Sequence, residues 1–173
     1  MSSLSRSLDL PTTGRVDALA QELALLNNKG KRRIAFLGSR HVPVVAIHLV
    51  ELIARSLAQE GHSIVTSGAQ GVNAAVIRAV LEIEPSLLTV VLPQSLNRQP
   101  PEIKHLLDHV LHLIEKNDND ELSLPMASSL CNQEIISRCD QLICFAFHDS
   151  ETLLNSCHSA EDIGKIVSLL FFD

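Results

Sequence analysis

Two short glycine-containing segments hold the residues whose types and spacing could do chemistry. The first is Gly38-Ser39-Arg40, and the second, TSGAQGVN at 66–73, contains Ser67, Gly68, Gly71 and Asn73. Glycine permits a tight turn and a close approach of a ligand to the backbone. Backbone N–H groups at the start of a helix, with the helix dipole behind them, bind phosphate and other anions. The two segments therefore predict an anion or nucleotide site, and a strand-to-helix turn without a ligand is the alternative.

Other side chains that commonly do chemistry form weaker patterns. The eight histidines show no ligand spacing, so we predict no metal site. His148 stands where a general base could act, but no nucleophile accompanies it. Ser39 and Ser67 lack the setting of a nucleophilic serine, so we expect no catalytic residue. The cysteines form no CxxC pair and are interpreted as free, mostly buried thiols: Cys131, Cys139, Cys144 and Cys157.

Composition limits the class of protein. A chain of 173 residues favours one domain. The net charge is −6 and all five aromatic residues are Phe, which argues against binding nucleic acid through counterion release or base stacking. No apolar run approaches the roughly 18 residues of a membrane helix, and the N-terminus has no secretory-type apolar stretch. We therefore expect a cytoplasmic protein.

The elements that must position these residues follow from apolar periodicity. Short apolar runs predict strands at 34–38, 63–68, 87–93, 109–114, 141–147 and 166–172. Helical spacing predicts helices at 15–28, 43–60, 71–83, 101–107, 125–138 and 150–162. We predict a flexible tail over 1–14 and a single domain over 15–173 that includes the helix at 15–28. The alternation predicts an α/β fold, doubly wound around a mainly parallel sheet of about six strands.

Ligands of such a sheet bind at the carboxyl ends of the strands, near the point where the strand order changes. The loops after the first, second and fifth strands should converge there. Glu151 in the last of them would repel a phosphate, so we expect a neutral or weakly anionic ligand, or none. The candidate ligand-binding residues are Gly38, Ser39, Arg40, Ser67, Gly68, Gly71, Asn73, Ser150 and Thr152.

The segments IAFLGSR, VTSGAQGVNAAVIRA and LTVVLP resemble the Rossmann-like superfamily of the DNA-processing protein A family. That superfamily also contains the lysine-decarboxylase-like phosphoribohydrolases. The resemblance covers about residues 32–172 and implies a Rossmann-like fold. Cys131-Asn132-Gln133 stands where the family has Arg-Asn-Arg, and Ser150-Glu151-Thr152 where it has Ser-Gly-Thr. The substrate-orienting arginine and catalytic glutamate of the phosphoribohydrolases have no clear counterparts, so we interpret the chain as a divergent stand-alone member.

These departures make a non-catalytic function the leading hypothesis, namely a regulatory or scaffolding protein with a degenerate nucleotide-binding site. No cofactor is implied. We expect a protein partner or self-association, allow a nucleotide-like small molecule, and consider nucleic acid an unlikely partner. Two alternatives stay open: a divergent nucleoside-monophosphate phosphoribohydrolase, and a DNA-binding accessory protein of the DNA-processing type.

Overall fold

A six-stranded, all-parallel sheet organises the protein, whose computed structural model describes residues 30–147 and 151–172. The strands are β1 (Arg33–Gly38), β2 (Ser63–Ser67), β3 (Leu88–Val91), β4 (His112–Ile114), β5 (Gln141–Phe147) and β6 (Ile166–Phe172). The helices are α2 (Val44–Gln59), α3 (Val72–Ile83), α4 (Pro101–Leu107), α5 (Leu124–Ser137) and α6 (Glu151–Asp162). The α/β fold class predicted from the sequence is confirmed. The predictions for 1–14 and 15–28 lie outside the described residues.

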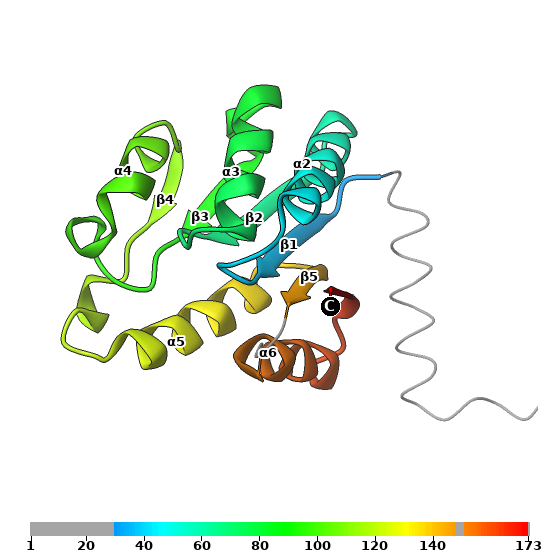
Figure 1. Ribbon diagram of the computed structural model, residues 1–173. Coiled ribbons are helices and arrows are strands. Elements are labelled where there is room, and N and C mark those ends of the chain that lie inside the picture. Colours follow the sequence, from blue (N-terminus) through cyan, green and yellow to red (C-terminus); the bar gives the residue numbers. More distant parts are fainter. Residues whose placement is uncertain (1–29, 148–150, 173) are drawn as a thin grey trace, which may run out of the picture. The chain divides into compact units, whose positions relative to one another are not determined.

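Two helical layers cover the sheet, with α2, α3 and α4 on one face and α5 and α6 on the other (Figure 1). Strand β1 shows why, because its side chains alternate between the two faces. Ile34 and Phe36 join the core under α2 and α3, whereas Ala35 and Leu37 join the core under α5 and α6. All four are buried, as expected for the central strand of a parallel sheet.

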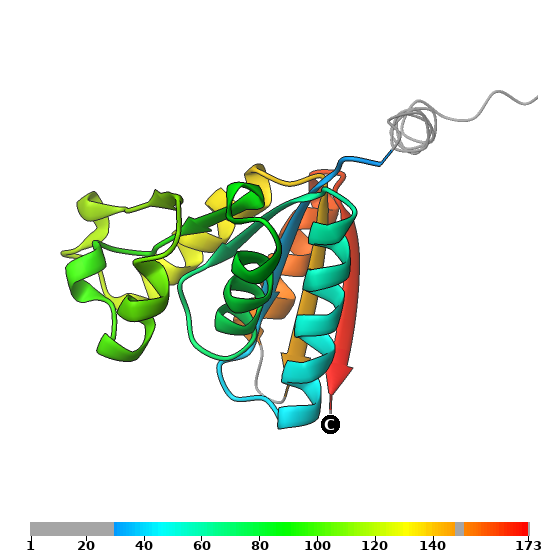
Figure 2. The same cartoon turned by 90° about the horizontal axis from the view of Figure 1, so that it is seen from above.

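The strand order is β4-β3-β2-β1-β5-β6. The strands β2 to β4 are thus added on one side of β1, and β5 and β6 are added on its other side, so the strand order reverses between β1 and β5. Figure 2 shows the consequence from above: α2 and α3 pass over one face before the chain crosses to the other for α5 and α6. Because every pairing is parallel, all carboxyl ends lie at the same edge of the sheet. A crevice for ligands is expected at this edge, beside the reversal point.

The predicted and observed elements differ mainly at β3 and β4. The strand expected at 87–93 is shorter, and short 3-10 turns at Pro85–Leu87 and Leu96–Arg98 flank it. The strand expected at 109–114 is also shorter, because hydrogen-bonded turns follow the end of α4. Val110 donates its N–H to the Leu107 carbonyl, so the residues before His112 continue the end of the helix. Among the described residues, no helix is both long and apolar enough to span a membrane.

Candidate functional site

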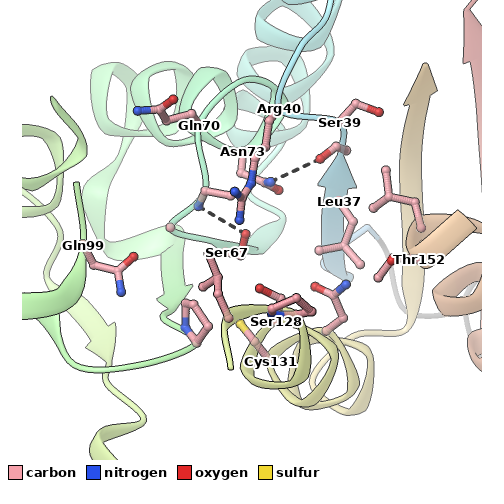
Figure 3. Close-up of a pocket in the computed structure, with 18 of the residues that line it drawn as sticks. Leu37, Ser39, Arg40, Ser67, Gln70, Asn73, Gln99, Ser128, Cys131 and Thr152 are labelled. Atoms are coloured by element: carbon pink, nitrogen blue, oxygen red, sulfur yellow. Dashed lines mark hydrogen bonds between the residues drawn. The ribbon is translucent and has the colours of Figure 1, made fainter. Parts of the chain in front are cut away.

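A cavity of about 800 Å³ opens at the carboxyl edge of the sheet, where the reversal between β1 and β5 places it (Figure 3). Its walls come from segments far apart in the sequence: the ends of β1 and β2, the loop after β3, the first half of α5, and the start of α6. The volume lies within the range of small-molecule and cofactor sites, which is about 300–1,000 Å³.

Most of the candidate residues from the sequence line this cavity. They are Gly38, Ser39, Arg40, Ser67, Gly68, Asn73 and Thr152. Gly71 is not part of the lining and stands at the N-terminal end of α3. Ser150 lies outside the described residues. The structure thus brings the three predicted loops to one place, while their binding role stays a prediction.

The glycines of these loops are required by protein packing. A Cβ atom at Gly38 would overlap the Val72 side chain, and one at Gly68 would overlap Leu92. Gly71 has φ +76° and ψ −123°, a backbone conformation that favours glycine. A Cβ there would also overlap the carbonyl oxygen of Arg40. The first two loops are therefore held against each other at backbone distance, which shapes one wall of the cavity.

Polar side chains tie the ends of the strands together. The Thr66 hydroxyl lies 2.8 Å from the Phe36 carbonyl and 2.9 Å from Oδ1 of Asn73, and the Asn73 amide reaches the Gly38 carbonyl at 3.5 Å. The Ser39 hydroxyl accepts a hydrogen bond from the Phe147 N–H at 3.0 Å. Asn73 and Ser39 thus fix β1 against β2 and β5, respectively.

The backbone N–H groups just before α3 are only partly used in hydrogen bonds within the protein. Val72 donates its N–H to the Ser39 carbonyl, and Ala69 donates its N–H to the Ser67 hydroxyl. The N–H groups of Gln70 and Gly71 donate to no atom of the described residues. Two backbone donors at a helix N-terminus therefore stand beside the cavity, in the environment that favours an anion.

The basic side chains of the lining within the described residues are Arg40, His41 and Arg98, and no Asp or Glu is among the lining residues. Figure 3 shows Arg40 extending into the cavity. Arg98 comes from the loop after β3, and its Nε lies 4.0 Å from an Asp120 carboxylate oxygen. Glu151 begins α6 and is not part of the lining, whereas its neighbour Thr152 is.

The lining residues that the sequence analysis missed include Gln94, Arg98 and Gln99. They belong to the loop after β3, which the sequence marks only as a proline-rich connection. The predicted parallel sheet could have identified this loop, because the loop after any strand of such a sheet lies at the ligand-binding edge. The first half of α5 adds Ser128, Cys131 and Asn132 to the wall. Cys131 is buried and its thiol donates to the Val91 carbonyl at 3.3 Å, and burial raises its pKa to about 12.

The chain is similar to a known protein family and to several solved structures. The family model of DNA recombination-mediator protein A matches residues 21–117. DNA processing protein A from Helicobacter pylori, described for its single-stranded DNA binding mode, is 21% identical with a TM-score of 0.68. That alignment covers 84% of this chain and 67% of the other. DNA processing protein A from Streptococcus pneumoniae is 18% identical with a TM-score of 0.51, and the alignment covers 84% of this chain but 60% of that one.

A third similar structure is the structural genomics target TM1055, which is 17% identical with a TM-score of 0.55 over 79% of this chain and 72% of the other. No curated protein matches the chain significantly. At these identities the solved structures establish the fold alone, and it is the Rossmann-like fold that the resemblance in the sequence implies.

The expectation that nucleic acid is an unlikely partner is wrong. The matched family is one of DNA recombination mediators, and the Helicobacter protein is described as binding single-stranded DNA. The physical error was to use the net charge of the whole chain, since the cavity wall carries arginine and histidine while the carboxylates lie elsewhere. The family model spans more than half of the chain and includes the Gly38–Arg40 and Ser67–Asn73 loops, and the chain therefore belongs to the DNA recombination-mediator protein A family.

Proposed function

We propose that this protein binds single-stranded nucleic acid in the cavity at the carboxyl edge of its sheet and acts as a non-catalytic accessory protein of the DNA-processing type. One observation carries the proposal: the described lining has two arginines and a histidine but no carboxylate, in a chain whose net charge is −6. Such a separation of charge concentrates positive potential where an anionic strand would enter.

The geometry suggests how a phosphodiester is held. Arg40 and Arg98 approach from different loops, and a guanidinium makes charge-assisted hydrogen bonds to phosphate oxygens. The N–H groups of Gln70 and Gly71 add neutral donors at the start of α3. Binding of this kind positions a strand by its backbone, which suits an accessory role in the cytoplasmic location that the sequence predicts.

The same lining argues against the phosphoribohydrolase alternative. Cleavage of a glycosidic bond calls for a general acid or a carboxylate near the leaving base. Glu134 and Glu151 are carboxylates on the helices α5 and α6 that border the cavity, and neither lines it. Glu134 instead accepts a hydrogen bond from Arg138 at 2.8 Å, which lowers the pKa of its carboxyl group. We therefore retain the non-catalytic role predicted from the sequence. In place of a degenerate nucleotide-binding site, we propose a functional site for single-stranded nucleic acid.

Salt dependence of binding tests the proposal. For a single strand, the slope of log K against log salt concentration is about −0.7 per neutralised phosphate, so two arginine contacts give about −1.4. We expect Arg40→Ala and Arg98→Ala each to make the slope less steep by about 0.7, measured by fluorescence anisotropy with a labelled mixed-sequence 20-mer. Lys31→Ala is the matched control, because Lys31 is exposed and precedes β1 at the opposite edge of the sheet.

Two results would count against this function. The first is no change of anisotropy with any single-stranded oligonucleotide at low salt. The second is binding whose slope is altered equally by Lys31→Ala and by the two cavity variants, because strand contacts would then be spread over the surface.

A further inference from the structure

Three amide side chains form part of the cavity wall away from the β1 and α3 loops: Gln94, Gln99 and Asn132. Gln94 is 6% exposed and Gln99 is 8% exposed, so both are largely removed from solvent. Figure 3 shows Gln99 across the cavity from Thr152. A buried amide has two donor hydrogens and one acceptor oxygen to satisfy, so its partners reveal what it offers to a ligand.

The partners of Gln94 fix which way its amide points. Nε2 of Gln94 donates to the Asn119 carbonyl at 3.2 Å and to the Leu122 carbonyl at 3.1 Å. Both acceptors are carbonyl oxygens, so the reversed amide would set oxygen against oxygen. Both donor hydrogens are thus used by the protein, and Oε1 is left as an acceptor.

Gln99 is oriented in the same way, since its Nε2 donates to the Ser95 carbonyl at 3.2 Å. For Asn132 the reasoning takes one more step. The Ser156 hydroxyl donates its hydrogen to the Thr152 carbonyl at 3.0 Å, so it can only accept from Asn132. Nδ2 of Asn132 therefore faces the Ser156 hydroxyl, at 3.3 Å, and Oδ1 is left over.

The three leftover oxygens belong to side chains of residues that line the cavity. None of them accepts a hydrogen bond from the described residues. Within that part of the chain, the one fully buried side-chain nitrogen or oxygen without a partner is Nε of Arg32, so these oxygens are not sealed in the core. Since all three residues line the cavity, their free acceptors are available to a ligand with hydrogen-bond donors.

Resting on the strand-binding function proposed above, we propose that Gln94, Gln99 and Asn132 form a base-reading wall that prefers a nucleobase with an exocyclic amino group over uracil or thymine. Cytosine presents an N4 amino group, whereas uracil and thymine present an O4 acceptor at the same position. An O4 atom that faces an amide oxygen finds no hydrogen-bond donor there. Both oxygens would also lose hydrogen bonds to water, which costs free energy. Prolines 93 and 100 and Leu124 supply apolar surface for the faces of the base.

The closest pair of probes is (dC)12 and (dU)12, because both are pyrimidine strands of equal charge that differ in amino against keto chemistry. Affinities are measured by competition against a labelled mixed-sequence 20-mer at pH 7.5 and constant salt. We expect (dC)12 to bind about five- to a hundredfold more tightly than (dU)12, the range that one well-formed base contact provides.

Two variants connect the preference to the wall. Gln99→Met and Asn132→Leu remove an acceptor oxygen from different elements at nearly constant volume, and each should reduce the ratio of the two affinities at least threefold. Gln70→Met is the matched control, because Gln70 also lines the cavity but its side chain is exposed. The control should leave the ratio unchanged within twofold.

The outcomes separate the two proposals. If wild-type protein binds (dC)12 and (dU)12 equally, or prefers (dU)12, the base-reading wall is wrong while the strand-binding function stands. A cytosine preference that survives in both Gln99→Met and Asn132→Leu also overturns the wall. If neither strand nor the 20-mer binds, both the wall and the proposed function fail.

Discussion

Replacing Gly71 with alanine is the sharpest test of how the two glycine-containing loops are held together. Gly71 has φ +76° and ψ −123°, and residues other than glycine lose about 1–3 kcal/mol in such a conformation. The added Cβ would also overlap the carbonyl oxygens of Ser39 and Arg40. Overpacking of a tight site costs about 1–3 kcal/mol, so the free energy of unfolding should fall by about 2–6 kcal/mol in total.

Gly61→Ala provides the matched control. Gly61 also has a positive φ, +87°, and follows the end of α2. A Cβ at this position meets only Cε of Lys31 at 3.4 Å, which is ordinary van der Waals contact. Its cost is therefore the backbone penalty alone, about 1–2 kcal/mol. The difference between the two variants measures the collision with the Ser39 and Arg40 carbonyls together with the extra backbone penalty of the Gly71 conformation.

Both variants are compared by urea unfolding followed by circular dichroism, because the chain has no Trp or Tyr for intrinsic fluorescence. We also expect Gly71→Ala to weaken binding of the labelled 20-mer, since relief of the collision moves the Gly38–Arg40 loop, whereas Gly61→Ala leaves binding unchanged. Equal losses of stability in the two variants, within about 0.5 kcal/mol, would refute the reasoning, because the carbonyl contact would then contribute nothing beyond the uncertainty expected for independent sites.

Two further predictions concern titratable groups. Asp140 accepts three hydrogen bonds from Arg33, which lower the pKa of its carboxyl group, so the stability it adds is present above pH about 4 and is lost as the pH falls through its folded pKa. Asp140→Asn should therefore lower stability at pH 7 by about 0.5–1 kcal/mol and flatten the acid side of the stability profile; an unchanged profile in urea titrations from pH 2 to 7 would contradict this. All four cysteines are buried, and burial raises the pKa of Cys131 to about 12, so at pH 8 a thiol reagent should label native protein much more slowly than urea-unfolded protein. Rapid labelling of Cys131 in native protein would show that the cavity wall around it opens.

Most of the fold could be predicted because each element carries its own local signal. The apolar run of β1 ends at Gly38, and α3 begins directly after Gly71, so periodicity and glycine mark both boundaries. β4 could not be placed as well, since the run HVLHLI satisfies a strand pattern while its first residues continue the turns after α4. Hydrogen bonding to the preceding helix decided between these structures, and a sequence pattern does not contain that information.

The candidate site was predicted on the β1 and β2 side and missed on the β3 side. Glycines mark the first two loops because their packing against Val72, Leu92 and the Ser39–Arg40 backbone admits no side chain. The loop that holds Arg98 and Gln99 has no such constraint. Its residues reach the cavity because the sheet order places β3 next to β2, which is a property of the whole fold.

The arginines that the family resemblance implies on α5 are absent, yet the described lining still carries Arg40 and Arg98 and no carboxylate. Cys131 and Gln133 stand at those positions, but only Cys131 lines the cavity, where its thiol is engaged with the Val91 carbonyl. Arg98 supplies a cation from another wall, and Oδ1 of Asn132 accepts no hydrogen bond from the described residues. In the two proposals above, the amide oxygens of one wall meet base edges, while arginines of the β1 and β3 loops meet the phosphate. Motif matching compares residues at fixed positions, whereas a ligand responds to the charges and acceptors that the fold brings to one cavity.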